Sequence, residues 1–318
     1  MPAQLETSLC GIRLKNPVLA ASGTFGYGLE FASLLNLNAL GGIITKGLSA
    51  APIAGNPAPR LWHTETGMIN SVGLQNVGVE VFVRDKLPKL RGYSVPIFTN
   101  VFGYRVEDYL AVLARLEDAE GIAAYELNIS CPNTKEGGIF FSSSPAATYD
   151  LVARARKAAK RPLLVKLSPN VASIQPFVTA VEEAGADCIS LVNTFISLAL
   201  DNQTRSARIG AGFGGLSGPG IRPVAVRLVY EAAQIAKIPI VGLGGICNGR
   251  DAAEFLIAGA SAVQVGTATF IDPRAPLLVA EQLRNEIARL GAPDPGSLVG
   301  SVRPLRPAAS KTECKIER

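Results

Sequence analysis

The chain is short of histidine, of charge and of long apolar segments. It has one histidine, His63, in 318 residues, so a metal site built from clustered histidines is excluded. Charged residues make up 18% of the chain and apolar ones 48%, which excludes a wholly disordered protein. No apolar run approaches the roughly 18 residues of a transmembrane helix. The first residues also lack the apolar core of a signal peptide, so we expect no membrane partner.

The cysteines argue against a zinc-binding protein, and the charges argue against a nucleic-acid-binding one. The five cysteines, at positions 10, 131, 188, 247 and 314, form no C-x-x-C pair and match no zinc spacing. We therefore expect free thiols in the reducing cytoplasm and no metal. The net charge is +5, and residues 301–318, with five Lys or Arg and two Glu, contribute +3 of it. The remaining chain has no clustered basic face, which predicts no nucleic-acid partner.

Short apolar segments recur along the chain and predict its fold. Such continuous runs are typical of parallel strands buried on both faces, and amphipathic helical patterns follow most of them. The alternation predicts one α/β domain over residues 1–300, a (β/α)8 TIM barrel, with a basic C-terminal tail at 301–318. An open doubly wound sheet is the alternative. The expected strands are 17–22, 42–46, 95–100, 124–129, 162–167, 188–193, 239–243 and 262–266. The expected helices are 106–118, 146–160, 174–184, 223–237, 249–258 and 274–290.

Two intervals between expected strands, 46–100 and 193–244, are longer than one helix requires. We expect insertions there, at the mouth of the barrel, because long insertions in compact domains usually form lids or binding loops. The second interval contains the glycine-rich stretch 210–220.

Polar residues stand at the carboxyl ends of the expected strands, where barrels of this kind carry their active sites. They are Ser22, Thr45, Lys46, Thr99, Asn100, Asn128, Lys166, Asn193 and Thr194. Burying such groups is unfavourable unless they find partners, so the pattern indicates a functional site. Glycines 244, 245 and 266, with Thr267, follow the last two strands, and they allow backbone amides to approach a phosphate closely. Lys46 and Lys166, in apolar surroundings with few acids, are expected to face an anionic ligand.

Cys131 differs from the other cysteines by its surroundings. It lies in a polar segment that ends in two glycines, at the predicted catalytic end, whereas Cys188 lies within an apolar run. A thiol in such a place can act as a nucleophile or a general base. An aldolase would instead use Lys46 or Lys166 to form a Schiff base.

The order of these motifs resembles one enzyme family. Residues 128–138 (NISCPNTKEGG), 70–76 (NSVGLQN) and 22–26 (SGTFG), with Asn193 and Thr194, are similar to dihydroorotate dehydrogenases of class 1. Within that class, residues 67–70 (GMIN) and 135–138 (KEGG) favour the NAD-linked 1B subtype, although residues 139–143 depart from the usual loop. Class 2 enzymes resemble the chain less, because they carry serine at the position of Cys131.

The resemblance implies an FMN-dependent oxidation of dihydroorotate to orotate in pyrimidine (UMP) biosynthesis. Cys131 would be the base that takes the C5 proton, and the flavin would take the C6 hydride. The residues expected to bind FMN are Ser22, Lys46, Gly47, Asn100, Asn128, Lys166, Val192, Gly218, Gly244, Gly245, Gly266 and Thr267. Those expected to bind the substrate are Lys46, Asn70, Ser71, Val72, Gly73, Leu74, Asn128, Asn193 and Thr194.

The subtype also implies partners. We expect a homodimer that forms a heterotetramer with an electron-transfer subunit carrying FAD and a [2Fe-2S] cluster. This chain has neither clustered cysteines for such a cluster nor a dinucleotide-binding fingerprint, so NAD would be reduced on the partner. Three alternatives remain at this point: the fumarate-reducing 1A subtype, an FMN barrel similar to dihydropyrimidine dehydrogenase, and a flavin-free phosphate-binding aldolase or isomerase.

Overall fold

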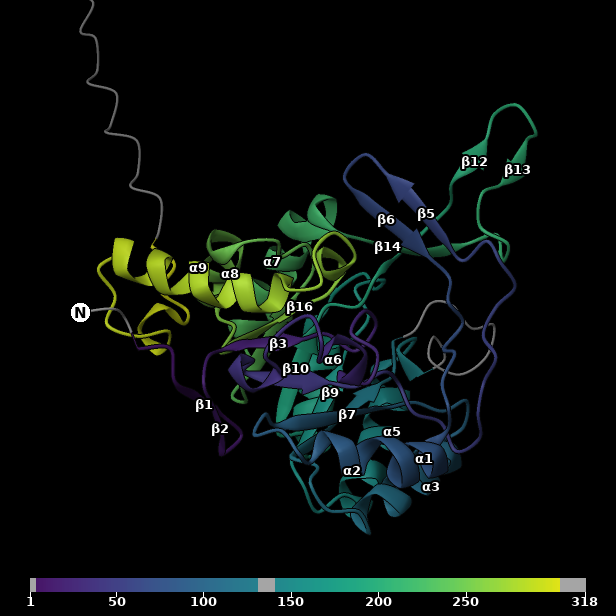
Figure 1. Ribbon diagram of the computed structural model, residues 1–318, viewed down its shortest axis with the longest axis horizontal. Helices are drawn as coiled ribbons and strands as arrows, with labels where there is room; N and C mark the ends of the chain where they lie inside the picture. The colour runs from purple at the N-terminus through teal and green to yellow at the C-terminus, as the bar shows by residue number, and fades with distance from the viewer. Residues whose placement is uncertain (1–3, 131–140, 304–318) are drawn as a thin grey trace, which may run out of the picture.

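The computed structural model describes residues 4–130 and 141–303, and its centre is a closed barrel of eight parallel strands (Figure 1). Each strand pairs with the next one along the chain, and β16 pairs with β3, with Val263 opposite Val18, to close the ring. The (β/α)8 barrel is thereby confirmed and the open sheet excluded. The strands are β3 (Val18–Ala20), β4 (Gly42–Ile44), β7 (Ile97–Val101), β8 (Ala124–Asn128), β9 (Leu163–Lys166), β10 (Cys188–Leu191), β15 (Ile240–Leu243) and β16 (Ala262–Val265).

Helices cover the outside of the barrel where the amphipathic patterns predicted them. They are α3 (Val106–Glu117), α5 (Pro145–Ala158), α6 (Gln175–Glu183), α7 (Arg222–Ala233), α8 (Gly249–Ala258) and α9 (Ala275–Arg289). Between β4 and β7 lie α1 (Val79–Val81), a π-helical turn (Phe82–Lys86) and α2 (Leu87–Leu90). Two short 3₁₀ helices, Leu29–Phe31 and Leu37–Ala39, connect β3 to β4. Among residues 4–130 and 141–303, no helix is both long and apolar enough to cross a bilayer.

Local sequence explains where individual helices begin. Helix α5 starts behind Ser144, whose hydroxyl accepts a hydrogen bond from the Ala147 amide at 3.1 Å, and Pro145 occupies the first helical position. Helix α8 starts behind Asn248, whose side chain accepts from the Asp251 amide at 3.0 Å. It ends at Gly259, with φ of +123°. These caps fix the lengths of the loops that lead from strand to helix at the catalytic end.

The amino-terminal end of the barrel is closed by a hairpin of β1 (Thr7–Leu9) and β2 (Ile12–Leu14). Leu9 and Leu14 pack into one apolar cluster with the barrel-interior side chains of Leu19, Phe98 and Leu164. All five side chains are at most 1% exposed. The opening of the barrel therefore lies at its carboxyl end.

The two predicted insertions meet and form one antiparallel sheet. Its order is β11 (Phe195–Ser197), β14 (Gly214–Ser217), β6 (Gly67–Asn70) and β5 (Leu61–Thr64), and the hairpin of β12 (Leu200–Asp201) and β13 (Ser206–Ala207) projects beyond it (Figure 1). Strand β14 lies within the glycine-rich stretch 210–220. Its glycines are required by close packing: a Cβ on Gly214 would lie 2.5 Å from Ile69 Cγ2, and one on Gly215 would lie 2.0 Å from Thr194 Oγ1.

Phe98 tests the packing of the barrel interior. Replacing it with alanine would leave a cavity among side chains that cannot collapse, so Phe98→Ala should lower the free energy of unfolding by about 3–5 kcal/mol. Chemical denaturation of the ligand-free protein measures this. Tyr149→Ala is the matched control, because Tyr149 is 44% exposed and its loss should change stability by no more than about 0.5 kcal/mol. Equal effects of the two changes would contradict the packing described above.

Candidate active site

One cavity opens at the carboxyl ends of the barrel strands, and every strand contributes to it. It encloses about 1140 Å³ of free space, with the open solvent at its mouth included. Strands β5 and β6 of the insertion sheet add Leu61, Met68 and Asn70 to its wall.

Most of the predicted site residues line this cavity. They are Ser22, Lys46, Gly47, Asn70, Val72, Gly73, Leu74, Asn100, Asn128, Lys166, Val192, Asn193, Thr194, Gly244, Gly245, Gly266 and Thr267. Ser71 does not: it is 1% exposed, and its hydroxyl accepts a hydrogen bond from Asn56 Nδ2 at 2.8 Å. Gly218 does not line it either, but its carbonyl oxygen lies directly behind Gly245. Cys131 lies outside the described residues.

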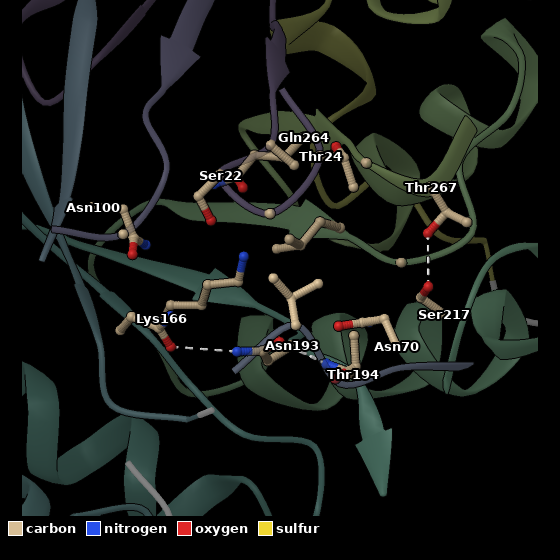
Figure 2. Close-up of a pocket in the computed structure, with 18 of the residues that line it drawn as sticks. Ser22, Thr24, Asn70, Asn100, Lys166, Asn193, Thr194, Ser217, Gln264 and Thr267 are labelled. Carbon is tan, nitrogen blue, oxygen red and sulfur yellow. Dashed lines mark hydrogen bonds between the residues drawn. The ribbon is translucent and has the colours of Figure 1, made fainter. Parts of the chain in front are cut away.

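Neutral amides are held in a fixed arrangement on one side of the cavity. Asn193 Nδ2 donates to Ser130 Oγ at 2.8 Å, and Asn193 Oδ1 accepts from the Thr194 amide at 2.8 Å. Asn193 Nδ2 is also 3.4 Å from Asn128 Oδ1 (Figure 2). Side chains that both donate and accept suit a planar ring with alternating N–H and C=O groups. The network ends at Ser130, the residue before Cys131.

Two lysines supply the positive charge of the cavity. Figure 2 shows the Lys166 side chain extending into the cavity between Ser22 and Asn193. Lys166 is 5% exposed, and no acidic side chain in the described part of the chain forms an ion pair with it or with half-buried Lys46. Burial lowers the pKa of Lys46 from its ordinary value of 10.5; Arg60 lowers it further, and Glu30 opposes the change. Both ammonium groups are therefore available to an anionic ligand.

Glycines form the part of the cavity wall that follows β15 and β16. Gly244 and Gly245 have φ of +129° and +78°, and a Cβ on Gly245 would lie 2.7 Å from the Gly218 oxygen. A Cβ on Gly266 would meet nothing nearer than 3.5 Å, so that glycine leaves open space at the wall. Thr267 Oγ1 donates to Ser217 Oγ at 2.8 Å beside it (Figure 2). Exposed backbone amides in such a wall suit a phosphate.

The loop after β15 is tied to two helices. The Asp251 carboxylate accepts from the Cys247 amide at 2.9 Å and forms an ion pair with Arg222 at the start of α7. Arg222 also reaches Glu254, 3.2 Å away, on α8. These contacts hold the Gly244–Gly245 turn against the ends of α7 and α8.

Sequence reasoning missed several lining residues. Thr24 lies in the loop after β3 and Ser217 is the last residue of β14, whereas Gln264 is the only polar residue in the apolar segment 262–266. That isolated polar residue was the signal that could have identified Gln264. Within the ranges 4–130 and 141–303, no three His, Cys, Asp or Glu side chains come together as a metal site.

Comparison with known proteins identifies the family. The family model described as dihydroorotate dehydrogenase matches residues 4–287. The chain belongs to the dihydroorotate dehydrogenase family. It is therefore an oxidoreductase acting on dihydroorotate in pyrimidine biosynthesis, as the resemblance implied, and the flavin-free aldolase or isomerase is excluded.

The relatives differ in the electron acceptor that their names give. The chain is 60% identical to "Putative dihydroorotate dehydrogenase A (fumarate)" of Solibacter usitatus (strain Ellin6076), over 95% of this chain and 100% of that one. It is 47% identical to "Dihydroorotate dehydrogenase B (NAD(+)), catalytic subunit" of Geotalea uraniireducens (strain Rf4), over 94% and 98%. A crystal structure of the enzyme from Eimeria tenella in complex with ferulenol shares the fold, with a TM-score of 0.81 at 20% identity over 94% and 88% of the two chains.

Lys46 should lower the stability of the ligand-free protein, because its charge is partly desolvated without an acidic partner. Lys46→Met should raise the free energy of unfolding by about 1 kcal/mol, while weakening the binding of anionic ligands. Below the lowered pKa the lysine is charged in both the folded and the unfolded state, and its charge costs stability only in the folded one. The advantage of the variant should therefore shrink as pH rises through the lowered pKa toward 10.5.

Chemical denaturation at several pH values measures this difference. Lys89→Met is the control, because Lys89 is exposed on α2. A destabilised Lys46→Met protein, or an advantage that grows with pH, would contradict the argument.

Proposed function

We propose that the chain is the FMN-binding catalytic subunit of a class 1B dihydroorotate dehydrogenase. The observation that supports this most strongly is one cavity that combines unpaired lysines, fixed neutral amides and a glycine wall at the carboxyl end of the barrel. The lysines suit anions, the amides suit a pyrimidine ring, and the glycines suit a phosphate. FMN and dihydroorotate together present these groups: a phosphate, a pyrimidine ring and anionic charge.

The cavity fits FMN in its unsatisfied polar atoms as well as in its glycines. Asn100 Oδ1 and Gln264 Oε1 are buried, and neither has a hydrogen-bond partner among the described residues. They are acceptors for N–H or O–H groups, which a flavin ring and its ribityl chain provide. The glycines at 244, 245 and 266, with Thr267, would hold the phosphate. Lys166 would face the ring and favour its anionic form.

The substrate's chemistry assigns roles to the remaining residues. Lys46 would hold the carboxylate of dihydroorotate, which distinguishes the substrate from the neutral bases used by enzymes similar to dihydropyrimidine dehydrogenase. Asn70, Asn128 and Asn193, with Thr194, would orient the ring. Cys131 would take the proton from C5. Bound FMN would supply the hydride acceptor for C6.

The proposed assembly rests on features at the surface and in the sequence. Exposed apolar side chains lie on β11 and β12 and directly beside β11 and β14, at Ile196, Leu198, Leu200 and Phe213, and they support a homodimer. The chain has no motif for a second redox centre, so electrons would reach NAD through a subunit with FAD and a [2Fe-2S] cluster. We place the reaction in the cytoplasm, where the cysteines stay reduced. The second candidate is the fumarate-reducing 1A enzyme, because the 60% identical relative is named as a fumarate-linked enzyme.

Cys131→Ala tests the chemistry. The variant should bind FMN and orotate, but anaerobic dihydroorotate should reduce its flavin about 10²–10⁴ times more slowly, the usual contribution of a general base. Stopped-flow absorbance of the flavin measures the rate. In the unchanged protein the rate should rise with pH as the thiol ionises.

Cys10→Ala is the control for that experiment, because Cys10 lies in the β1–β2 turn at the opposite end of the barrel. It should leave the rate unchanged. Wild-type flavin reduction in Cys131→Ala would disprove the assigned base, and a colourless purified protein that does not take up FMN would contradict the function.

The electron acceptor is tested with the purified chain alone. Without a second redox centre it should oxidise dihydroorotate with artificial dyes or oxygen but form no NADH, and adding the FAD and iron–sulfur subunit should restore NADH formation. Steady-state assays with NAD, fumarate and a dye compare the possibilities. NADH formed by the chain alone would refute the two-subunit proposal, and rapid fumarate reduction would assign the chain to subtype 1A.

A further inference from the structure

A buried carboxyl group lies beneath the cavity and takes no part in the chemistry proposed above. Glu126, on β8, is 0% exposed and faces the barrel interior. Its Oε1 accepts a hydrogen bond from Asn100 Nδ2 at 2.7 Å, and its Oε2 accepts from Gln264 Nε2 at 2.6 Å. Ser190 Oγ, on β10, also donates to Oε2, at 2.8 Å. The group therefore joins β8 to β7, to β10 and, across the barrel, to β16.

The partners of Glu126 determine how two amide groups are turned. A carboxylate can only accept hydrogen bonds, so each amide must present its NH₂ group to it. An amide that was turned around would place two acceptor oxygens face to face in a buried site, at a considerable cost in stability. The contact with Glu126 therefore selects one orientation of Asn100 and one of Gln264.

That orientation leaves the amide oxygens free. Asn100 Oδ1 and Gln264 Oε1 are buried and accept from no group in the described part of the chain, although both residues line the cavity. Asn100 Oδ1 lies beside Gly47: a Cβ on that glycine would be 2.9 Å from the oxygen. Buried acceptors without partners are uncommon in folded proteins, and here they occur at the floor of a ligand cavity.

We propose that Glu126 is a positioning residue that turns Asn100 Oδ1 and Gln264 Oε1 toward the cofactor, where one of them accepts the N3–H of the flavin ring. This inference rests on the proposed function, because it requires FMN in the cavity. Glu126 would not contact the flavin. Its effect is to make the floor of the site accept, and not donate, hydrogen bonds.

The test compares FMN with 3-methyl-FMN, which lacks the N3–H donor. Ligand-free protein is titrated with each flavin, and flavin fluorescence gives the two dissociation constants. The wild type should bind FMN at least about 10 times more tightly, a ratio that corresponds to one good hydrogen bond. In Glu126→Gln, the new side chain offers one donor and one acceptor, so one amide must turn its NH₂ toward the cavity. The preference should then fall to about 2-fold or less.

Ser190→Ala is the matched control, because it removes one partner of Glu126 but neither acceptor. It should keep the wild-type preference even where it lowers the thermal unfolding midpoint. A merely structural Glu126 would weaken the binding of both flavins equally in Glu126→Gln and leave their ratio intact, and that result would overturn the proposal.

Two further variants decide the matter where Glu126→Gln does not fold. Asn100→Leu and Gln264→Met each remove one acceptor, and at least one of them must abolish the preference. A preference retained in both variants, or a wild type that binds the two flavins equally, would overturn the proposal and leave the proposed function standing. A wild type that binds neither flavin would contradict the function itself.

Discussion

The pairing of β16 with β3 is the constraint on which the rest of the molecule depends. Closing the sheet there removes both of its edges and brings the carboxyl ends of eight strands around one opening. Residues as distant in sequence as Ser22 and Gln264 become neighbours of one cavity through this closure alone. The apolar cluster around Leu9 and Phe98 blocks the other end. A ligand can therefore enter only where the polar side chains are, and the position of the site follows from the topology.

The fold could be predicted from the sequence because its signals are local. Buried strands need continuous apolar runs, and the helices need apolar residues at helical spacing, so both periodicities are visible without tertiary information. The sheet formed by the two insertions lacked such a signal. Two of the four residues of β14 are glycines that allow the close approach of β6 and Thr194, and this requirement arises only when distant segments meet.

The candidate site was predictable to the extent that strand ends could be located. Segment 70–74 was assigned as a whole from its resemblance, yet Asn70 and Val72 face the cavity while Ser71 points away to Asn56. Alternation of side chains in extended chain explains the difference and could have been applied to the sequence. Gly218 lies behind Gly245, and no local sequence pattern reveals this contact.

The chemistry proposed for the cavity follows from the separation of its polar groups. Lys46 and Lys166 line the cavity, and no acidic side chain among residues 4–130 and 141–303 forms an ion pair with either of them. Glu126, a carboxylate in the barrel interior, has both of its oxygens occupied by amide and hydroxyl donors. A negative charge could therefore be buried beneath the site without neutralising the lysines.

The choice of the proposed base follows from the scarcity of histidine. The single histidine of the chain, His63, lies on β5 and outside the cavity, so we assign proton transfer to another residue type. Among the remaining side chains, a thiol has the ordinary pKa nearest to neutrality. The roles that we propose for the lysines, the amides and Cys131 are therefore consistent with the separation of charges in the barrel.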